Sequence, residues 1–233
     1  MQQIDGKIVR STHDGQAVSF FVTDPNDVIQ AHHNRGRFYE LEELAIIGRH
    51  FPPGGLFLDI GANVGNHTVF AVKFLHARDV VVIEPNPPAI LVLEANVDLN
   101  GIRRSVDLSH VGLGLSDEVA VTTAVSDQGN LGATRLVPRQ GDDGIRVLPG
   151  DDLFGGRRFD FIKIDVEGME LRVLNGLRQT VANSRPAMFI EVDDANAAAF
   201  AAFLSGIDYE IIDRFKRYAN NANYLVEPVE RTR

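Results

Sequence analysis

The chain has 233 residues, 44% of them hydrophobic, which is enough for one α/β domain with a substantial buried core. Its formal net charge is -9, from 32 acidic and 23 basic residues without a basic block, so we expect no nucleic-acid partner. The chain contains no cysteine, which excludes disulfides, thiolate metal sites and thiol catalysis. No apolar run approaches the roughly 20 residues of a membrane helix, and the first residues do not resemble a signal peptide. We therefore expect a cytoplasmic protein without a membrane span.

Residues 1–37 are predicted to form an extension that precedes the main domain. Residues 7–23 are β-prone on both sides of an Asp-Gly pair, a strong turn signal, and predict a β-hairpin. Residues 24–27 contain proline, asparagine and aspartate, which break the chain and can cap a short helix. His32 and His33 lie in an otherwise polar segment, so we expect both side chains to be exposed.

Residues 38–233 are predicted to form a single domain in which strands and helices alternate. Apolar residues recur at helical spacing over residues 38–50, and the next apolar strand runs into a glycine turn at Asp59. Further strands are expected at residues 80–83, 106–115, 159–165 and 187–191, and two mutually antiparallel strands at 209–212 and 223–226. Further helices are expected at residues 66–75, 88–100, 169–181 and 195–205. This alternation implies a mostly parallel sheet with helices on both faces and ligands at the carboxyl ends of its strands.

Residues 119–150 interrupt this alternation. The stretches 119–125 and 133–137 are short and β-prone, and a polar, glycine-containing segment separates them. Such a pattern predicts an inserted β-hairpin or lid rather than another strand–helix unit.

The glycine turn is the first candidate for ligand binding. Gly61 and Gly65 allow the backbone to approach a ligand closely where a strand passes into a helix, as in nucleotide-binding α/β folds. Their spacing, Gly-x-x-x-Gly, differs from the Gly-x-Gly-x-x-Gly of dehydrogenases. The turn alone therefore leaves the identity of the cofactor open.

Several predicted strands end in an acidic residue, namely Asp59, Glu84, Asp165 and Glu191. The carboxyl ends of parallel strands meet at one edge of a sheet, so these acids indicate a common site. Glu84 lies 23 positions after Gly61, the usual place of a carboxylate that accepts hydrogen bonds from both ribose hydroxyls. The alternative is that Glu84 is an exposed acid at the end of a strand.

Lys163 interrupts the apolar strand at residues 159–165 and shares one face with Phe161 and Asp165. A lysine in a covered strand needs an anionic partner or a polar cavity. Two interpretations follow. Lys163 forms a structural ion pair with Asp165 or Glu191, or it lines a reaction pocket together with a carboxylate.

Five segments of the chain form a recognisable combination of motifs. They are Phe57–Thr68, Val82–Asn86, Asn96–Gly101, Phe161–Glu170 and Asn223–Leu225. Together they resemble the FkbM family of S-adenosylmethionine-dependent methyltransferases, and the resemblance runs from about residue 38 to residue 226. It implies a Rossmann-like class I methyltransferase fold, with a mostly parallel sheet and an antiparallel terminal strand. The expected fold further includes the N-terminal β-hairpin and the β-hairpin insert.

The resemblance also implies a cofactor, S-adenosyl-L-methionine, and the residues that hold it. The turn from Asp59 to Gly65 would hold the amino-acid end, Glu84 the ribose, and the segment at Ser116 would flank the adenine. The implied cofactor-binding residues are Asp59, Gly61, Asn63, Gly65, Asn66, Glu84, Pro85, Asn86, Ser116 and Asp165. Family members are mostly O-methyltransferases, so we expect a small-molecule or glycan acceptor such as a sugar, a glycoconjugate or a secondary metabolite.

An alcohol acceptor must lose its proton during methyl transfer, which calls for a general base or a cation that stabilises the alkoxide. We assign Asp165 as the acceptor-side carboxylate, Lys163 as its electrostatic partner and Glu167 as a further catalytic candidate. His67 is also a candidate, with a role in cofactor binding or in the structure as its alternative.

A divalent metal ion is an additional option. Asp165 and Glu191 would end adjacent strands, where Mg²⁺ could bind the acceptor hydroxyls. Asp193 and Asp194 follow closely in the sequence. The alternative is that Glu191 caps a helix or pairs with Lys163.

Two other classes of function are compatible with the glycine turn. A nicotinamide-dependent oxidoreductase would share the turn and Glu84, but it would not account for the segment around Lys163. A non-catalytic nucleotide-binding module is the second alternative. The sequence also leaves the oligomeric state open, a homo-oligomer included.

Overall fold

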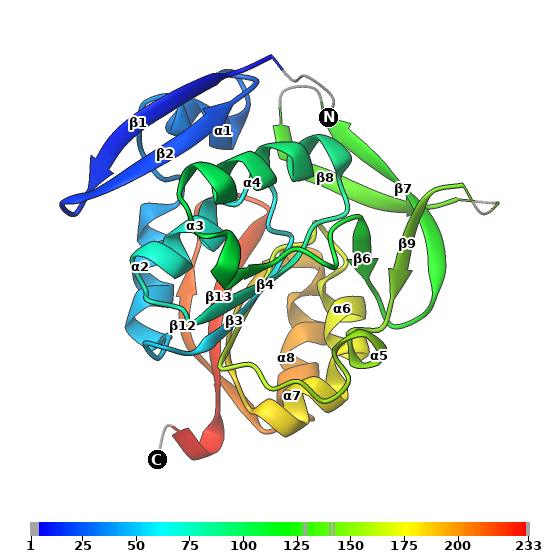
Figure 1. Ribbon diagram of the computed structural model, residues 1–233. Coiled ribbons are helices and arrows are strands. Elements are labelled where there is room, and N and C mark those ends of the chain that lie inside the picture. The colour runs from blue at the N-terminus through cyan, green and yellow to red at the C-terminus, as the bar shows by residue number, and fades with distance from the viewer. Residues whose placement is uncertain (1–4, 128–129, 140, 142, 232–233) are drawn as a thin grey trace.

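A seven-stranded sheet forms the centre of the molecule (Figure 1). The computed structural model describes residues 5–127, 130–139, 141 and 143–231. The strand order is β12-β13-β11-β10-β3-β4-β5. β13 alone runs opposite to the other six strands of this sheet, which confirms the predicted α/β fold with a mostly parallel sheet. The strands are β3 (Leu56–Ile60), β4 (Asp79–Ile83), β5 (Val106–Asp107), β10 (Phe161–Ile164), β11 (Ala187–Asp193), β12 (Tyr209–Phe215) and β13 (Asn221–Pro228).

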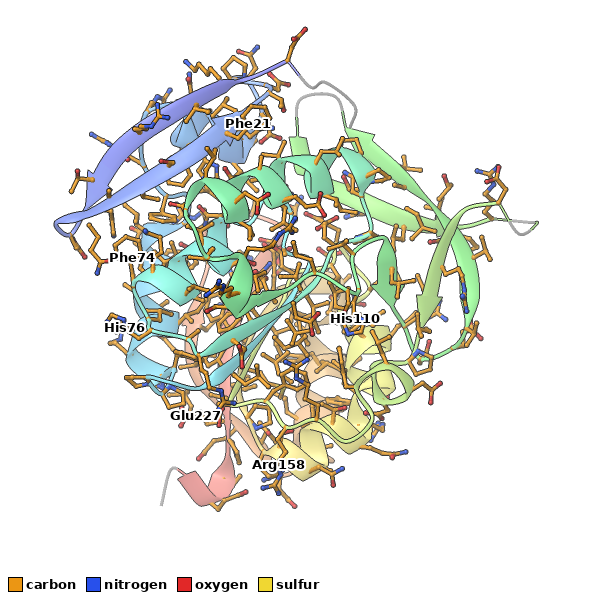
Figure 2. All side chains as sticks on the ribbon, in the orientation of Figure 1. Phe21, Phe74, His76, His110, Arg158 and Glu227 are labelled. Atoms are coloured by element: carbon orange, nitrogen blue, oxygen red, sulfur yellow. The ribbon has the colours of Figure 1, made fainter. Side chains whose placement is uncertain are left out.

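Helices cover both faces of the sheet, as predicted for a parallel sheet, and side chains fill the space between the layers (Figure 2). Successive side chains of β3 point to opposite faces of the sheet, because Phe57 packs with one hydrophobic cluster and Leu58 with the other. One layer contains α2 (Leu41–His50), α3 (Asn66–Lys73) and α4 (Pro87–Leu99). The other contains α5 (Gly150–Phe154), α6 (Glu170–Gly176), α7 (Arg178–Ser184) and α8 (Ala197–Ser205). Short 3-10 turns are η1 (Arg103–Ser105), η2 (Asp194–Asn196) and η3 (Val229–Arg231).

The N-terminal segment forms the predicted hairpin, β1 (Lys7–His13) and β2 (Gln16–Val22), followed by the short helix α1 (Val28–His33). Asp27 caps this helix, because its side chain accepts hydrogen bonds from two backbone N–H groups of the first turn. Val18, Phe20 and Val22 are buried in the same cluster as Phe57 of the central sheet. The hairpin therefore shares its core with the domain that was predicted to begin at residue 38.

The expectation that His33 is exposed was wrong. Its side chain is fully buried, it stacks on Phe20 with ring centroids 4.2 Å apart, and its Nε2 lies 3.0 Å from Asn66 Oδ1. The polar sequence around it gave no sign of this, because the burial comes from tertiary contacts with Phe20 of β2 and with Asn66 of α3. His32 is partly exposed.

The predicted insert is present as a hairpin of β7 (Ala120–Asp127) and β8 (Asn130–Pro138) within a separate four-stranded sheet. The other two strands are β6 (Leu113–Leu115) and β9 (Ile145–Leu148), in the order β6-β9-β7-β8. The single strand predicted at residues 106–115 was wrong. That stretch divides into β5 and β6, which belong to different sheets, and Gly112 adopts a positive φ of 86° between them.

The helix predicted at residues 169–181 is divided into α6 and α7 at Leu177. Gly176 lies so close to the insert that an added Cβ would stand 2.0 Å from the carbonyl oxygen of Ser116. This close backbone approach brings the end of α6 against the residue that follows β6. Within the described residues, no helix combines the length and the apolar character needed to cross a membrane.

Candidate active site

Two adjoining cavities lie at the carboxyl ends of the central strands, where the sequence predicted a site. The first encloses about 570 Å³ of empty space, open solvent included, and lies between β3, β4 and the insert. The second encloses about 1180 Å³, again with open solvent included, and reaches from the end of β11 to α1 and the start of α2. Four residues line both cavities: Gly61, Asn63, Asp165 and Glu167. A group bound in one cavity would therefore meet a group bound in the other at these residues.

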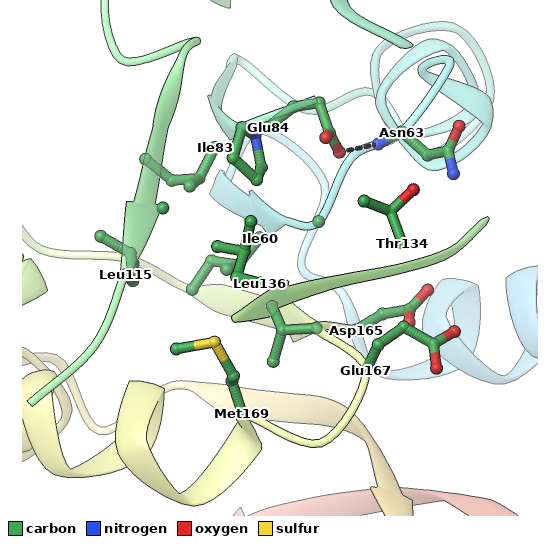
Figure 3. A pocket seen from close by; sticks show the side chains of 14 residues that line it. Ile60, Asn63, Ile83, Glu84, Leu115, Thr134, Leu136, Asp165, Glu167 and Met169 are labelled. Carbon is green, nitrogen blue, oxygen red and sulfur yellow. Dashed lines mark hydrogen bonds between the residues drawn. The ribbon is translucent and has the colours of Figure 1, made fainter. Parts of the chain in front are cut away.

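The first cavity is a mostly apolar slot with carboxylates at its rim, Glu84 on one side and Asp165 and Glu167 on the other (Figure 3). The four-stranded sheet contributes Thr134 and Leu136 from β8, and Leu115 from β6, so it closes the slot on one side. The apolar side chains that line the slot are Ile60, Ile83, Leu115, Leu136, Val166 and Met169. Such walls suit a flat heterocycle, and the polar rim suits hydroxyl groups attached to it.

Glu84 is the buried carboxylate at this rim. It is 5% exposed, and its oxygens accept hydrogen bonds from the backbone N–H groups of Asn63 (2.7 Å) and Asn86 (2.8 Å). Burial raises the pKa of Glu84 to about 7, although both backbone hydrogen bonds favour its charged form. These bonds hold the side chain in one position beside the slot. The alternative, that Glu84 is an exposed acid at the end of a strand, is thereby excluded.

The glycine turn is tightly packed against the neighbouring strand. Gly61 has a φ of 75°, and a Cβ at this position would lie 1.8 Å from the carbonyl oxygen of Asp165. Gly65 has a φ of 84°, and its Cβ would lie 2.5 Å from a methyl carbon of Leu93. Gly61 therefore needs glycine for packing against backbone as well as for backbone conformation, whereas at Gly65 the positive φ is the main requirement, because the Leu93 side chain can shift.

Lys163 is a buried cation that connects the turn with the acidic residues around it. Its ammonium nitrogen donates to the carbonyl oxygen of Gly61 at 2.7 Å and lies 3.3 Å from Asp165 Oδ2 and 3.7 Å from Asp59 Oδ1. Burial acts to lower the pKa of Lys163, but Asp165, Asp59 and Glu40 together hold it above its ordinary value. The predicted pair with Asp165 is thus present. Among the described residues no ion pair joins Lys163 to Glu191.

The predicted cofactor-binding residues divide into those that line a cavity and those that support it. Gly61, Asn63, Glu84, Pro85 and Asp165 line the first cavity, and Asn66 lines the second. The side chains of Asp59, Asn86 and Ser116 are buried behind these walls, and Gly65 begins α3. Asp59 accepts a hydrogen bond from Thr68 Oγ1 at 2.6 Å, and Asn86 donates to Thr134 Oγ1 at 3.1 Å.

Three carboxylates converge where the two cavities meet. Asp165 follows β10, and Glu191 lies within β11 directly after Ile190, which pairs with Ile164 in the parallel register. Glu167 adopts a positive φ of 47° beside them. One oxygen from each of Asp165, Glu167 and Glu191 lies within 4.8 Å of the others, a spacing at which they could hold a metal ion. Burial and the neighbouring Asp165 raise the pKa of Glu167 to about 7 and that of Glu191 to about 10.

The second cavity contains a residue that the sequence gave no reason to select, Glu40. It precedes α2 with a left-handed φ of 57°, is largely buried, and its Oε2 lies 3.8 Å from Nε2 of His67. Burial raises the pKa of Glu40 to about 8, and burial also holds the pKa of His67 well below its ordinary value. A positive φ in a residue other than glycine is the structural signal that singles out Glu40, and it has no counterpart in the sequence pattern.

The loop between β12 and β13 forms another wall of the second cavity. Arg217 donates two hydrogen bonds to the buried carboxylate of Glu43 (2.7 and 2.6 Å) and one to Glu42 (2.6 Å). The hydroxyl of Tyr218, next to Arg217, is hydrogen-bonded to that of Tyr39. These contacts attach the loop to the start of α2, and the sequence did not predict them because the partners are more than 170 positions apart.

Solved structures with this fold include methyltransferases. The FkbM methyltransferase of Methylobacillus flagellatus KT is 18% identical, with a TM-score of 0.55, and the match covers 88% of this chain and 56% of that one. A protein of the NADB-Rossmann superfamily from Streptococcus agalactiae is 15% identical, with a TM-score of 0.53 and coverage of 81% and 68%. The M1A22 tRNA methyltransferase TrmK of B. subtilis is 15% identical, with a TM-score of 0.50 and coverage of 82% and 68%. At these identities the similarity shows the fold alone.

The sequence itself matches a family model, although no curated protein matches it. The matching model describes the methyltransferase FkbM domain and covers residues 59–226, which is most of the chain. The match begins at the glycine turn and ends in β13, so it includes the lining residues of both cavities that come from the central strands. The chain therefore belongs to the FkbM methyltransferase family.

Proposed function

We propose that the protein transfers the methyl group of S-adenosylmethionine to a hydroxyl oxygen of a sugar, a glycoconjugate or another secondary metabolite. The observation that carries this proposal is the pair of adjoining cavities that meet at Asp165 and Glu167. One cavity has the form of a nucleoside site, and the other is wider and more polar. A donor and an acceptor held in this way would be aligned for a direct displacement at carbon.

The residues of the first cavity fit S-adenosylmethionine. Its apolar slot suits the adenine ring, and Glu84 stands where a carboxylate can accept hydrogen bonds from the ribose hydroxyls. The turn at Gly61 and Asn63 opens toward the second cavity and is the natural place for the amino-acid end. When bound, this cofactor supplies an activated methyl group, so the protein need only position the acceptor and remove its proton.

Asp165 is the residue best placed to act on the acceptor hydroxyl. It lines both cavities, and its carboxylate is held 3.3 Å from the Lys163 ammonium. Lys163 is 4% exposed and already bonded to Gly61, so in this proposal it positions Asp165 and balances its charge. Glu167, which also lines both cavities, is the second candidate for the proton acceptor.

The test has two steps. Calorimetry with S-adenosylmethionine should show binding, and a methyl-transfer screen against methyl glycosides, glycolipid extracts and tRNA should yield a methylated carbohydrate or metabolite, identified by mass. Absence of S-adenosylmethionine binding would contradict the enzyme proposal and favour a non-catalytic module. Binding of NADH in its place would revive the oxidoreductase alternative, and methylated tRNA would contradict the proposed acceptor class.

The Mg²⁺ prediction needs a test of its own. Loss of methyl transfer in EDTA, restored by added Mg²⁺, would support a metal ion that binds acceptor hydroxyls at the acidic residues. Full activity in EDTA would exclude this role.

A further inference from the structure

Two asparagines at the end of α4 belong to a motif that the sequence singled out, yet neither of them lines a cavity. Asn96 lies in the helix and is fully buried, and Asn100 follows its last residue and is partly buried. They are four positions apart, so their side chains lie on the same side of the helix. Both side chains bond to backbone groups of distant segments, and these partners define what each asparagine does.

Both asparagines hold the N-terminal hairpin. β2 pairs with β1 along one edge, and α4 lies beside β2 (Figure 1). Asn100 accepts a hydrogen bond from the N–H of Ser19 at 3.0 Å and donates one to its carbonyl oxygen at 2.7 Å. Asn96 Oδ1 accepts from the N–H of Phe21 at 2.6 Å. The two side-chain amides therefore satisfy backbone groups of β2 as a neighbouring strand would.

Asn96 also reaches the glycine turn. Its Nδ2 donates to the carbonyl oxygen of Val64 at 2.7 Å, and Val64 is fully buried. Phe21 offers an N–H group and Val64 a carbonyl oxygen, and the amide of asparagine carries an acceptor and a donor that match this pair. The side chain of Asn100, by contrast, bonds only to Ser19 and to the backbone of α4 within the described part of the chain. Asn96 thus connects the hairpin to the turn, and Asn100 does not.

The bond to Val64 acts on the part of the turn that faces the cavities. Without Asn96, the buried carbonyl group of Val64 would lose its hydrogen bond, so the backbone would have to move toward another donor. Such a movement would displace Asn63, because the two residues are adjacent. Asn63 lines both cavities, at the place proposed for the amino-acid end of the cofactor.

We propose that Asn96 is a positioning residue for S-adenosylmethionine. It holds the glycine turn against the N-terminal hairpin, so that the turn keeps the shape that receives the amino-acid end of the cofactor. Asn96 acts through the backbone of the turn and lines neither cavity. The hairpin lies outside residues 59–226, which match the family model, and through this contact it takes part in cofactor binding. This inference rests on the proposed function.

The experiment compares two ligands by calorimetry. They are S-adenosylmethionine and 5′-methylthioadenosine, which keeps the adenosine and the methylthio group but lacks the amino-acid end. Asn96→Ala should weaken binding of S-adenosylmethionine about tenfold and leave that of 5′-methylthioadenosine nearly unchanged, because only the first ligand uses the turn.

Asn100→Ala is the matched control, because it removes hydrogen bonds to the same hairpin and leaves the bond to Val64 in place. It should lower the melting temperature without changing either affinity. Equal losses for the two ligands in Asn96→Ala, or the same loss of S-adenosylmethionine binding in both variants, would show a general structural role and overturn the inference, with the proposed function intact. A wild-type protein that binds neither ligand would overturn both.

Melting curves show whether each variant is folded. Asn96→Leu, which nearly keeps the volume of the side chain, takes the place of the alanine variant if that protein does not fold. Hydrogen exchange of the wild-type protein needs no variant. S-adenosylmethionine should slow exchange of the Phe21 N–H more than that of the Ser19 N–H, and 5′-methylthioadenosine should not, because a ligand that depends on a contact also stabilises it. Equal slowing of both N–H groups by S-adenosylmethionine would contradict the inference.

Discussion

Glu84 shows how one buried carboxylate can be kept ready for a ligand. Two backbone N–H groups hold its oxygens, one from the glycine turn and one from the residue after Pro85. The charged form is therefore stabilised by hydrogen bonds although burial disfavours it. A ligand hydroxyl would add to an arrangement that exists before binding, and little ordering of the side chain would be needed.

Replacing Glu84 should weaken cofactor binding. Glu84→Ala removes the acceptor of the ribose hydrogen bonds, and we expect the dissociation constant of S-adenosylmethionine to rise at least tenfold, about 1.4 kcal/mol. Calorimetry measures the change, and Glu118→Ala, on the surface and away from both cavities, is the control. Unchanged affinity in the Glu84 variant would contradict the assignment of the ribose site.

The raised pKa of Glu84 also predicts a pH dependence of stability. The ordinary value is 4.5 and the folded value is about 7, so the folded protein holds a proton that the unfolded chain loses over this interval. The unfolding free energy without ligand should therefore fall as the pH rises from about 4.5 to about 7, by roughly 3 kcal/mol from this group, and then level off.

Urea unfolding at several pH values measures this slope. Glu84→Gln, which cannot titrate, should show a smaller decrease than the wild type over the same interval. An identical slope in both proteins would show that Glu84 does not hold the proton. The pKa of Glu167 is also raised to about 7, so Glu167 should add to the decrease in unfolding free energy over the same pH interval. Glu167→Gln should remove that contribution.

Lys163 should be essential for stability. Lys163→Met leaves Asp59, which is fully buried, without its cation, and we expect a loss of about 3–5 kcal/mol in the free energy of unfolding. Denaturant unfolding measures it. The double variant Lys163→Met with Asp59→Asn should recover part of the loss, because the uncompensated charge is then gone. A double variant as unstable as the single one would show that the charge of Asp59 is not the cause.

At the level of secondary structure, the site depends on how closely the end of β3 approaches the end of β10. Gly61→Ala would place a Cβ 1.8 Å from the Asp165 carbonyl oxygen, so the two strand ends would have to separate. We expect a loss of at least about 3 kcal/mol in stability together with loss of cofactor binding.

Gly54→Ala is the matched control for this substitution. Gly54 has a similar φ of 79°, but a Cβ there would meet nothing within 4 Å. Gly54→Ala should lower the free energy of unfolding only by the penalty of the left-handed backbone conformation, about 1 kcal/mol, and cofactor binding should be retained. Equal effects of the two substitutions, measured by denaturant unfolding and calorimetry, would mean that the contact with Asp165 is unimportant.

The elements that could be predicted are those whose sequences carry a period or a continuous apolar run. The strands β3, β4, β10 and β11 are buried on both faces, and their apolar runs identified them together with the acids at or near their carboxyl ends. Short elements such as β9 and α5 have too few residues for a pattern, so they were missed. The first cavity could thus be predicted from its strand-end residues.

The acceptor side could not be predicted in the same way. Glu40, Tyr39 and Tyr218 come from the start of a helix and from a loop, where no periodicity exists. Their place in the second cavity depends on the contact between Arg217 and Glu43, which joins distant parts of the chain. The burial of His33 likewise depends on tertiary packing, against Phe20 of the preceding strand β2 and Asn66 of α3, which no periodicity in the sequence indicates.

For the molecule as a whole, the N-terminal hairpin is part of the hydrophobic core. A chain that begins at residue 38 would lose the burial of Val18, Phe20 and Val22, each worth about 1.5–3 kcal/mol. That sum is comparable to the whole stability of an ordinary domain, so we expect the shortened chain not to unfold cooperatively. Circular dichroism during heating tests this. Cooperative unfolding at the wild-type temperature would show that residues 38–233 form an independent unit.

Phe20→Ala is a milder change to the same part of the core. It should lower the free energy of unfolding by about 3–5 kcal/mol.

The position of β13 has a consequence for the order in which the protein acquires its structure during synthesis. This strand lies inside the sheet, between β11 and β12, although it is the last of the described strands in the chain. While the ribosome is still translating the residues before Asn221, the nascent chain carries β11 with one edge unpaired, next to the acidic residues of the site. Exposed strand edges invite pairing with other chains. β11 can therefore complete its pairing only after residues 221–228 have been synthesised. Premature termination before these residues would yield an aggregation-prone fragment rather than a smaller enzyme.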